Sequence, residues 1–154
     1  MLNIKEKNRI EKYSAYTPKI AKILFDYFNL PDLQVKIDNN FNNCQFAWDN
    51  FSEKAYRIRI SIDYIEKSYT LRKNYFEDRH NIKINTFLDI FLIILLHEIG
   101  HYYYFTDLGY KNYSGRSYQQ RYKKHDIRLC EKDADEFAEN KFSGAKLFLQ
   151  EVLK

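Results

Sequence analysis

Cysteine is scarce in this chain of 154 residues, which contains only Cys44 and Cys130. The two residues form no C-x-x-C pair, and the single bridge that they could make is not a disulfide framework. We therefore expect two buried thiols and a protein of a reducing, cytoplasmic compartment.

The chain also lacks a long apolar run. The longest one, Phe87–Leu96, is too short to span a bilayer, and Asp89 interrupts it. The first residues, Met1–Lys12, are charged and have no apolar centre, so we expect no secretory signal and no contact with a membrane. Because no repeat, low-complexity segment or linker divides the sequence, we predict one domain over residues 1–154.

Strong charge of one sign is absent too, since the formal net charge is +4. Such a balance permits contact with nucleic acid but does not indicate it. The Tyr-, Lys- and Arg-rich stretch over residues 110–124 leaves a nucleic-acid binder as one alternative, although a solvated surface loop explains it equally simply. A content of 45% apolar and 18% aromatic residues predicts a folded protein.

The predicted elements alternate between helices and short strands. Thr17-Pro18 is typical of a helix start and Pro31 of a helix end, after a polar lead-in over residues 1–13. Strand-like segments follow at Leu33–Ile37, Cys44–Trp48 and Ala55–Ile62, the last of which alternates apolar and polar residues as in an antiparallel sheet. Further helices are predicted over residues 63–78, 86 to about 105, 127–142 and 145–153, with a break at Ser143-Gly144.

The motif His97-Glu98-Ile99-Gly100-His101 ends the most apolar of these segments. Residues four apart lie on one face of a helix, so His97 and His101 can direct two imidazoles at one metal ion. Glu98 then lies beside that ion and could act as a base on a water molecule held there. This H-E-x-x-H spacing is typical of zinc metallopeptidases.

A catalytic zinc ion takes three protein ligands, and the motif supplies two. Glu131 is our candidate for the third, because a turn of 100° per residue places it in the middle of an apolar helix stripe. A buried carboxylate is costly unless it is paired or bound to a metal. Asp135, one turn further on, could accept the free N–H of a ligating histidine.

Alternatives to these assignments remain open. Glu131 could instead form a buried ion pair with a lysine or arginine. His125 is a competing third ligand, although it lies on no apolar stripe that we can define. We expect His80, beside Arg79 in a charged stretch, to be solvated. Acidic residues on the other faces of the predicted C-terminal helix should also point to solvent, namely Asp133, Glu136 and Glu139.

The two motifs together resemble those of a known family. H-E-I-G-H at residues 97–101, followed by E-x-x-A-D-x-F-A at residues 131–138, is similar to the pattern of the ImmA/IrrE-like gluzincin metallopeptidases. The resemblance implies zinc bound by His97, His101 and Glu131, with Glu98 as the catalytic base. It also implies a zincin-like α+β fold, in which a small antiparallel or mixed sheet packs on the buried active-site helix and on the C-terminal helix that bears Glu131.

The resemblance further implies a reaction and a partner. The expected activity is zinc-dependent hydrolysis of peptide bonds in a protein substrate, for which a regulatory DNA-binding repressor is one candidate. The edge strand of the sheet would pair with the extended substrate, and we expect residues 55–62 to form it. The chain departs from the family in lacking a helix-turn-helix module, in lacking a further C-terminal domain and in its long stretch over residues 110–124.

The sequence leaves open both an alternative function and the identity of one catalytic group. The alternative function is a zincin-like module that binds a protein partner with little or no hydrolysis. A tyrosine of the 110–124 stretch could stabilise the oxyanion and the whole stretch could gate the cleft, but the sequence does not distinguish among Tyr110, Tyr113, Tyr118 and Tyr122.

Overall fold

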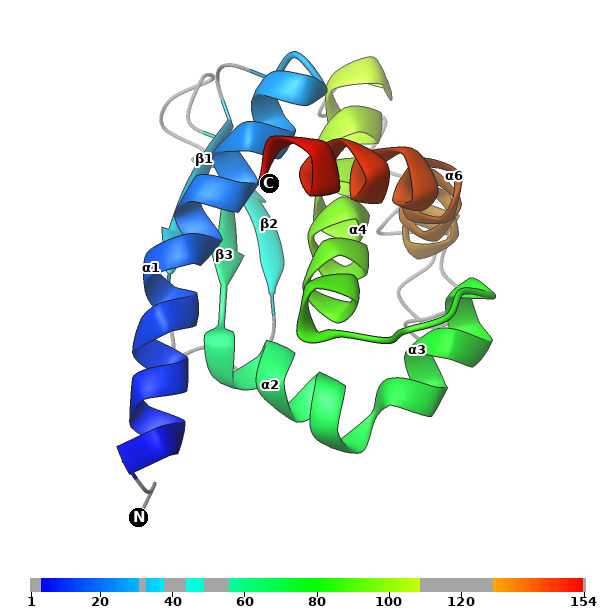
Figure 1. Cartoon of the computed structure of the whole chain (residues 1–154). Helices are drawn as coiled ribbons and strands as arrows, with labels where there is room; N and C mark the ends of the chain where they lie inside the picture. The colour runs from blue at the N-terminus through cyan, green and yellow to red at the C-terminus, as the bar shows by residue number, and fades with distance from the viewer. Residues whose placement is uncertain (1–3, 31–32, 38–43, 49–55, 109–128, 154) are drawn as a thin grey trace.

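The computed structural model (Figure 1) describes residues 4–30, 33–37, 44–48, 56–108 and 129–153. These residues form a small α+β domain that is mostly helical. In chain order its elements are α1 (Ile4–Tyr27), β1 (Leu33–Ile37), β2 (Gln45–Trp48), β3 (Tyr56–Ile60), α2 (Ile62–Leu71), α3 (Lys73–His80), α4 (Phe87–Leu108) and α6 (Leu129–Val152). The expectations for Tyr110–Lys124 and His125 lie outside the described residues.

The three strands form a mixed sheet with the order β1-β3-β2. β3 pairs in parallel with β1 and antiparallel with β2, so the purely antiparallel arrangement suggested by its alternation is wrong and the mixed alternative holds. The expectation that residues 55–62 form the edge strand is also wrong, since β3 is the central strand. Alternation shows which face of a strand is buried, but it does not show how many neighbours the strand has.

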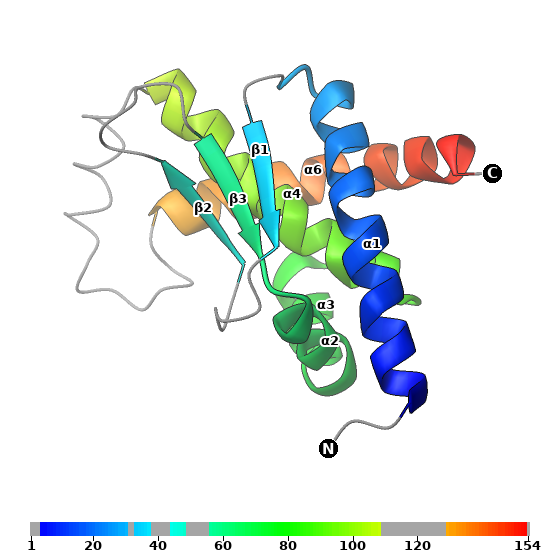
Figure 2. The same cartoon turned by 90° about the vertical axis from the view of Figure 1, so that its left-hand side faces the viewer.

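Helix α4 runs through the middle of the core. Ile90, Leu92, Ile93 and Leu96 are fully buried, and the sheet covers one side of the helix while α6 crosses another (Figures 1 and 2). A helix that is apolar on all sides has to be enclosed in this way. The core also includes the thiols of Cys44 and Cys130, which are buried as expected.

A capping box formed by Thr86 and Asp89 begins α4. The backbone N–H of Thr86 donates to Asp89 Oδ2 at 3.1 Å, and the N–H of Asp89 donates to Thr86 Oγ1 at 3.4 Å. Asp89 is almost fully buried and also forms an ion pair of 2.9 Å with Lys146 of α6. The same carboxylate therefore begins α4 and ties it to the C-terminal helix.

Helix α1 begins earlier than predicted, and it ends ahead of Pro31 as expected. It begins at Ile4 and continues through Pro18, so Thr17-Pro18 is not its start. Its last residue is Tyr27, and the φ of 60° at Asn29 allows the N–H of Leu30 to donate to the carbonyl of Phe25 at 2.8 Å. Asparagine tolerates this left-handed conformation, and the resulting bond is that of a Schellman motif.

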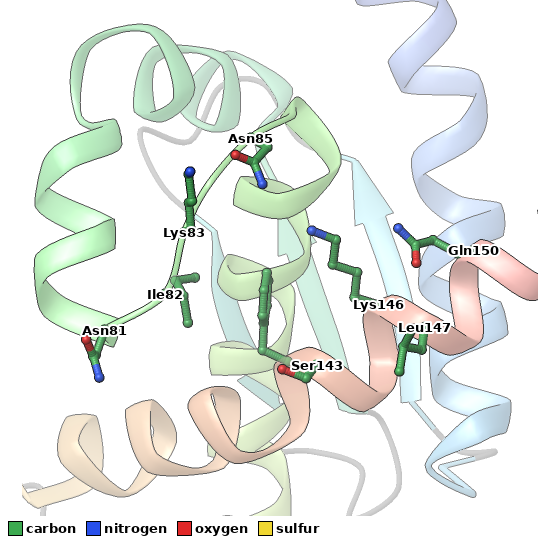
Figure 3. Close-up of a pocket in the computed structure, with 9 residues that line it drawn as sticks. Asn81, Ile82, Lys83, Asn85, Ser143, Lys146, Leu147 and Gln150 are labelled. Atoms are coloured by element: carbon green, nitrogen blue, oxygen red, sulfur yellow. The ribbon is translucent and has the colours of Figure 1, made fainter.

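Two other boundaries were predicted incorrectly. The segment over residues 63–78 is divided at Arg72 into α2 and α3. The predicted break at Ser143-Gly144 is absent, because α6 is one continuous helix. The ribbon of α6 does change direction close to Ser143 (Figure 3). A serine–glycine pair is thus the site of a bend here and not the end of the helix.

Gly100 lets α4 and α6 approach each other closely. A Cβ atom at this position would lie 3.0 Å from Cα and 3.1 Å from the carbonyl oxygen of Ala134. Both are backbone atoms, so any larger residue would push α6 away. Gly100 lies inside the H-E-x-x-H motif, and Ala134 is one turn after Glu131, so this contact sets the distance between the two parts of the candidate site.

Among the described helices, none is both long and apolar enough to cross a membrane.

Candidate metal site

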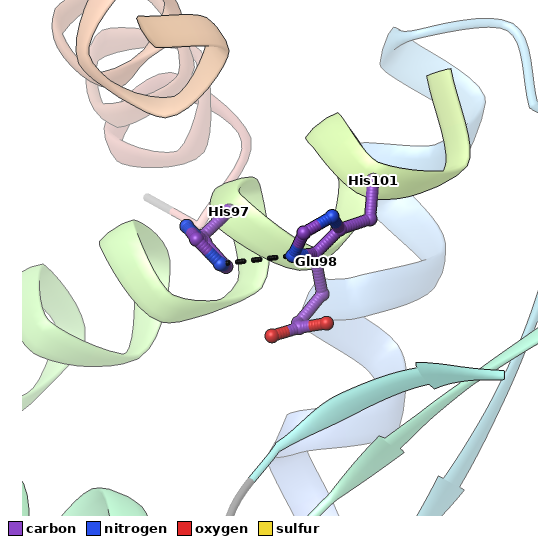
Figure 4. A group of neighbouring side chains, drawn as sticks. All are labelled: His97, Glu98 and His101. Atoms are coloured by element: carbon purple, nitrogen blue, oxygen red, sulfur yellow. Dashed lines mark hydrogen bonds between the residues drawn. The ribbon is translucent and has the colours of Figure 1, made fainter. Parts of the chain in front are cut away.

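Helix α4 presents the three polar residues of the motif together. His97, Glu98 and His101 offer donor atoms that all lie within 4.8 Å of one another, so they could hold a metal ion. The two imidazoles meet edge to face, with 3.1 Å between their Nε2 atoms (Figure 4). Glu98 and His101 are buried, so their polar atoms are largely removed from water.

Helix α6 adds a fourth group to this cluster. Glu131 is buried, with its Oε2 atom 2.9 Å from His97 Nε2 and its Oε1 atom 3.2 Å from His101 Nε2. The apolar stripe used to select Glu131 is also observed, since Ala134, Ala138 and Ala145 are fully buried. The candidate ligands His101 and Glu131 are therefore close in space although they are far apart in the sequence.

The chemistry of this donor set fits a metal ion. Two imidazole Nε2 atoms and a carboxylate lie 2.9–3.2 Å apart, and each presents a lone pair to the others when both imidazoles are neutral with the proton on Nδ1. Such atoms repel one another unless a proton or a cation lies between them. Ligands bound tetrahedrally at 2.0–2.1 Å from zinc are about 3.3 Å apart, which is close to the observed spacing.

Asp135 lies one turn after Glu131 and contacts the other side of His97. Its Oδ1 atom is 2.7 Å from His97 Nδ1, which therefore donates to the carboxylate. Burial by itself would lower the pKa of His97, but the bonds to Asp135 and Glu131 outweigh it and raise the pKa to about 10. Burial acts in the opposite sense on Asp135, and the bonds from His97 and Arg79 hold its pKa below the usual value.

Arg79 and His80, at the end of α3, were not predicted to take part. Arg79 Nε donates to Asp135 Oδ2 at 3.0 Å, and its Nη2 atom lies 3.8 Å from Glu131 Oε2. His80 is buried, not solvated as expected, and its Nδ1 atom is 3.3 Å from Glu139 Oε1. Glu139 is exposed, as expected, and this contact also links it to α3.

A weak signal for this missed contact exists in the sequence. Glu131, Asp135 and Glu139 are spaced four residues apart, so they form a stripe along one side of α6. A stripe of three acids calls for a basic partner, and Arg79-His80 is one adjacent basic pair. The sequence offers several such pairs, however, and only the packing of α3 selects this one.

Comparisons with protein-family models, curated proteins and solved structures gave no match.

Glu98 extends from α4 towards the sheet, away from the contact between the two imidazoles (Figure 4). Its surroundings include Cys44, which directly precedes β2. Burial raises the pKa of the Cys44 thiol well above its usual value, a hydrogen bond from the Ser61 backbone opposes this, and the negative charge of Glu98 adds to the rise. The Cys44 thiol therefore stays protonated at neutral pH and does not act as a base.

A separate open pocket of about 490 Å³ lies between the connection from α3 to α4 and the C-terminal half of α6 (Figure 3). It is lined by Asn81, Ile82, Lys83, Asn85, Phe142, Ser143, Lys146, Leu147 and Gln150. None of these residues belongs to the candidate metal site, and Lys146 is already paired with Asp89.

Proposed function

We propose that this protein is a zinc-dependent metallopeptidase with a zincin-like fold, similar to the ImmA/IrrE-like gluzincins. The observation that carries the proposal is the convergence of His97, His101 and Glu131, from two helices, with Nε2 and carboxylate oxygens 2.9–3.2 Å apart. Two imidazoles with one carboxylate form a typical ligand set of catalytic zinc, which leaves a further position open.

Each residue of the site has a separate task in the proposed reaction. Bound zinc would supply Lewis acidity, which polarises the scissile carbonyl and makes a water molecule more acidic. Glu98 accepts a proton from the attacking water and later donates it to the nitrogen that leaves. Asp135 keeps the proton of His97 on Nδ1, so that Nε2 presents its lone pair.

The sheet supports a way to hold the substrate. Because β3 is central, an extended peptide cannot pair with it, whereas β2 pairs with β3 alone among the described strands. β2 lies beside α4, and Cys44, which directly precedes β2, interacts electrostatically with Glu98. We therefore transfer the proposed substrate contact from residues 55–62 to β2, where a peptide would add a further strand.

The proposal is tested with the Glu98→Gln variant. The amide cannot accept a proton, so hydrolysis of an unfolded protein such as casein should fall by about 10²-fold or more. Zinc content, measured by mass spectrometry, should stay equal to that of the wild type, since Glu98 is assigned no ligand role. His101→Ala is the matched control, and it should lose both zinc and activity.

Two results would reject the assignment. Loss of zinc in Glu98→Gln would show that this residue is a ligand and not the base. A zinc-loaded wild type that cleaves neither casein nor a co-expressed repressor would favour the alternative, a module that binds a partner without hydrolysis.

A further inference from the structure

An arginine from a third helix reaches both carboxylates that α6 contributes to the candidate site. Arg79 is held at three points: Nε donates to Asp135 Oδ2 at 3.0 Å, Nη1 donates to Tyr75 Oη at 3.0 Å and Nη2 lies 3.8 Å from Glu131 Oε2. Its side chain is only 16% exposed. An arginine held by several partners has few accessible side-chain conformations. It can therefore hold the carboxylates that it contacts in one orientation.

The two oxygens of Asp135 are used differently. Oδ1 accepts from His97 Nδ1 and Oδ2 accepts from Arg79 Nε. The arginine thus determines the rotation of the carboxylate, and the carboxylate determines the rotation and tautomer of the imidazole. Through this chain of contacts α3 controls the direction in which His97 Nε2 points.

The charges of the candidate site also favour a role for Arg79. Glu98, Glu131 and Asp135 bring three negative charges to the site, whereas a divalent metal with two neutral imidazoles brings two positive ones. Glu131 is buried, and an excess of buried negative charge is costly. Arg79 places one positive charge 3.0–3.8 Å from two of these carboxylates, which offsets one of the negative charges.

We propose that Arg79 is a positioning residue of the metal site, acting through Asp135 and Glu131 and touching neither metal nor substrate. The inference rests on the proposed metal site. Lysine should replace it only in part, because an ammonium group carries the charge but lacks the planar set of N–H donors.

The test compares Arg79→Gln with Arg72→Gln. Both arginines lie near the ring of Tyr75, at 5.9 and 4.5 Å from its centroid, but Arg72 is exposed and precedes the helix on which Arg79 lies. Zinc affinity is measured by competition with a chromophoric chelator. Arg79→Gln should weaken zinc binding by about tenfold or more and Arg79→Lys by less, while Arg72→Gln should match the wild type.

A second measurement separates positioning from a general loss of stability. The visible absorption spectrum of the Co²⁺-loaded protein reports ligand geometry, and it should change in Arg79→Gln but not in Arg72→Gln. The double variant Arg79→Gln/Asp135→Asn provides a further comparison. The loss of zinc affinity caused by Arg79→Gln should be much smaller in the Asp135→Asn background than in the wild type, because both residues act through the same contact. If Arg79→Gln does not fold, Tyr75→Phe removes one of its partners and should shift the zinc affinity in the same direction.

The outcomes distinguish this inference from the proposed function. A wild type that fails to bind zinc would reject the metal site itself. A wild type that binds zinc, together with equal affinities and equal Co²⁺ spectra in Arg79→Gln and Arg72→Gln, would reject the role of Arg79 alone. Fully additive effects of Arg79→Gln and Asp135→Asn would also reject it.

Discussion

Both ring nitrogens of His97 contact a carboxylate, and these two contacts determine the protonation of the imidazole. Nδ1 contacts Asp135 and Nε2 contacts Glu131, so a protonated imidazole between two carboxylates is stabilised in the metal-free protein, with a pKa raised to about 10. A metal ion has to displace the proton on Nε2, since only the neutral imidazole is a ligand. Protons therefore compete with the metal at this nitrogen.

A second buried acid gives a prediction that does not involve the metal site. Burial by itself would raise the pKa of Asp89, but the Lys146 ammonium and the N–H groups of Asn85 and Thr86 outweigh it and hold the pKa below its usual value. Because the folded-state pKa is lowered, the stabilisation is complete above about pH 3.9 and is lost as pH falls towards the folded-state value.

Asp89→Asn should therefore destabilise the protein by about 1 kcal/mol at pH 7, and the difference from the wild type should be smaller at an acidic pH below the ordinary aspartate pKa of about 3.9. Urea unfolding at the two pH values measures this. Asp63→Asn is the control, since Asp63 is an exposed acid in the first turn of α2. A difference for Asp89→Asn that is the same at both pH values would show that its charge has no part in stability.

At the scale of elements, the contact between α4 and α6 determines whether the ligands meet. α4 carries His97 and His101, α6 carries Glu131, and the two helices touch at Gly100 and Ala134. Helix α3 also contacts the acidic residues of α6, since Arg79 binds Asp135 and His80 contacts Glu139. A small change in the spacing of two helices would thus separate the donor atoms.

We predict that Gly100→Ala destabilises the protein by about 1–3 kcal/mol and weakens zinc binding, because the new methyl group would meet the backbone of Ala134. Gly144→Ala in α6 is the matched control, since its Cβ would have Tyr27 Oη at 3.8 Å as its nearest contact. It should stabilise the helix by about 0.5–1 kcal/mol. Urea unfolding and zinc titration measure both. Similar changes in the free energy of unfolding of the two variants would show that α4 and α6 are not closely packed at Gly100.

At the scale of the whole molecule, a metal that joins α4 to α6 should stabilise the folded state. Zinc at 100 times its dissociation constant should raise the free energy of unfolding by about 2.7 kcal/mol if it binds only the folded protein. We expect this rise in the wild type and a smaller one in Glu131→Gln, measured by thermal unfolding with zinc and with a chelator. An unchanged rise in Glu131→Gln would place the third ligand elsewhere, for which His125 is the alternative.

Local patterns were sufficient for a large part of the fold and of the candidate site. The spacing of His97 and His101 follows from helix geometry alone, and the stripe around Glu131 follows from burial. Strand β1 was predicted with its observed bounds, Leu33–Ile37. These features depend on residues close together in the chain, so the periodicity of apolar residues reveals them.

Tertiary structure decided the rest. Pro18 continues a helix, Ser143-Gly144 bends one, and β3 occupies the centre of the sheet, because in each case the surrounding packing outweighs the local preference. His80 was predicted to be solvated, and both its burial and the contacts of Arg79 depend on the packing of α3 against α6. An ion pair between residues 56 positions apart has no local signature, since its energy depends on where two helices meet.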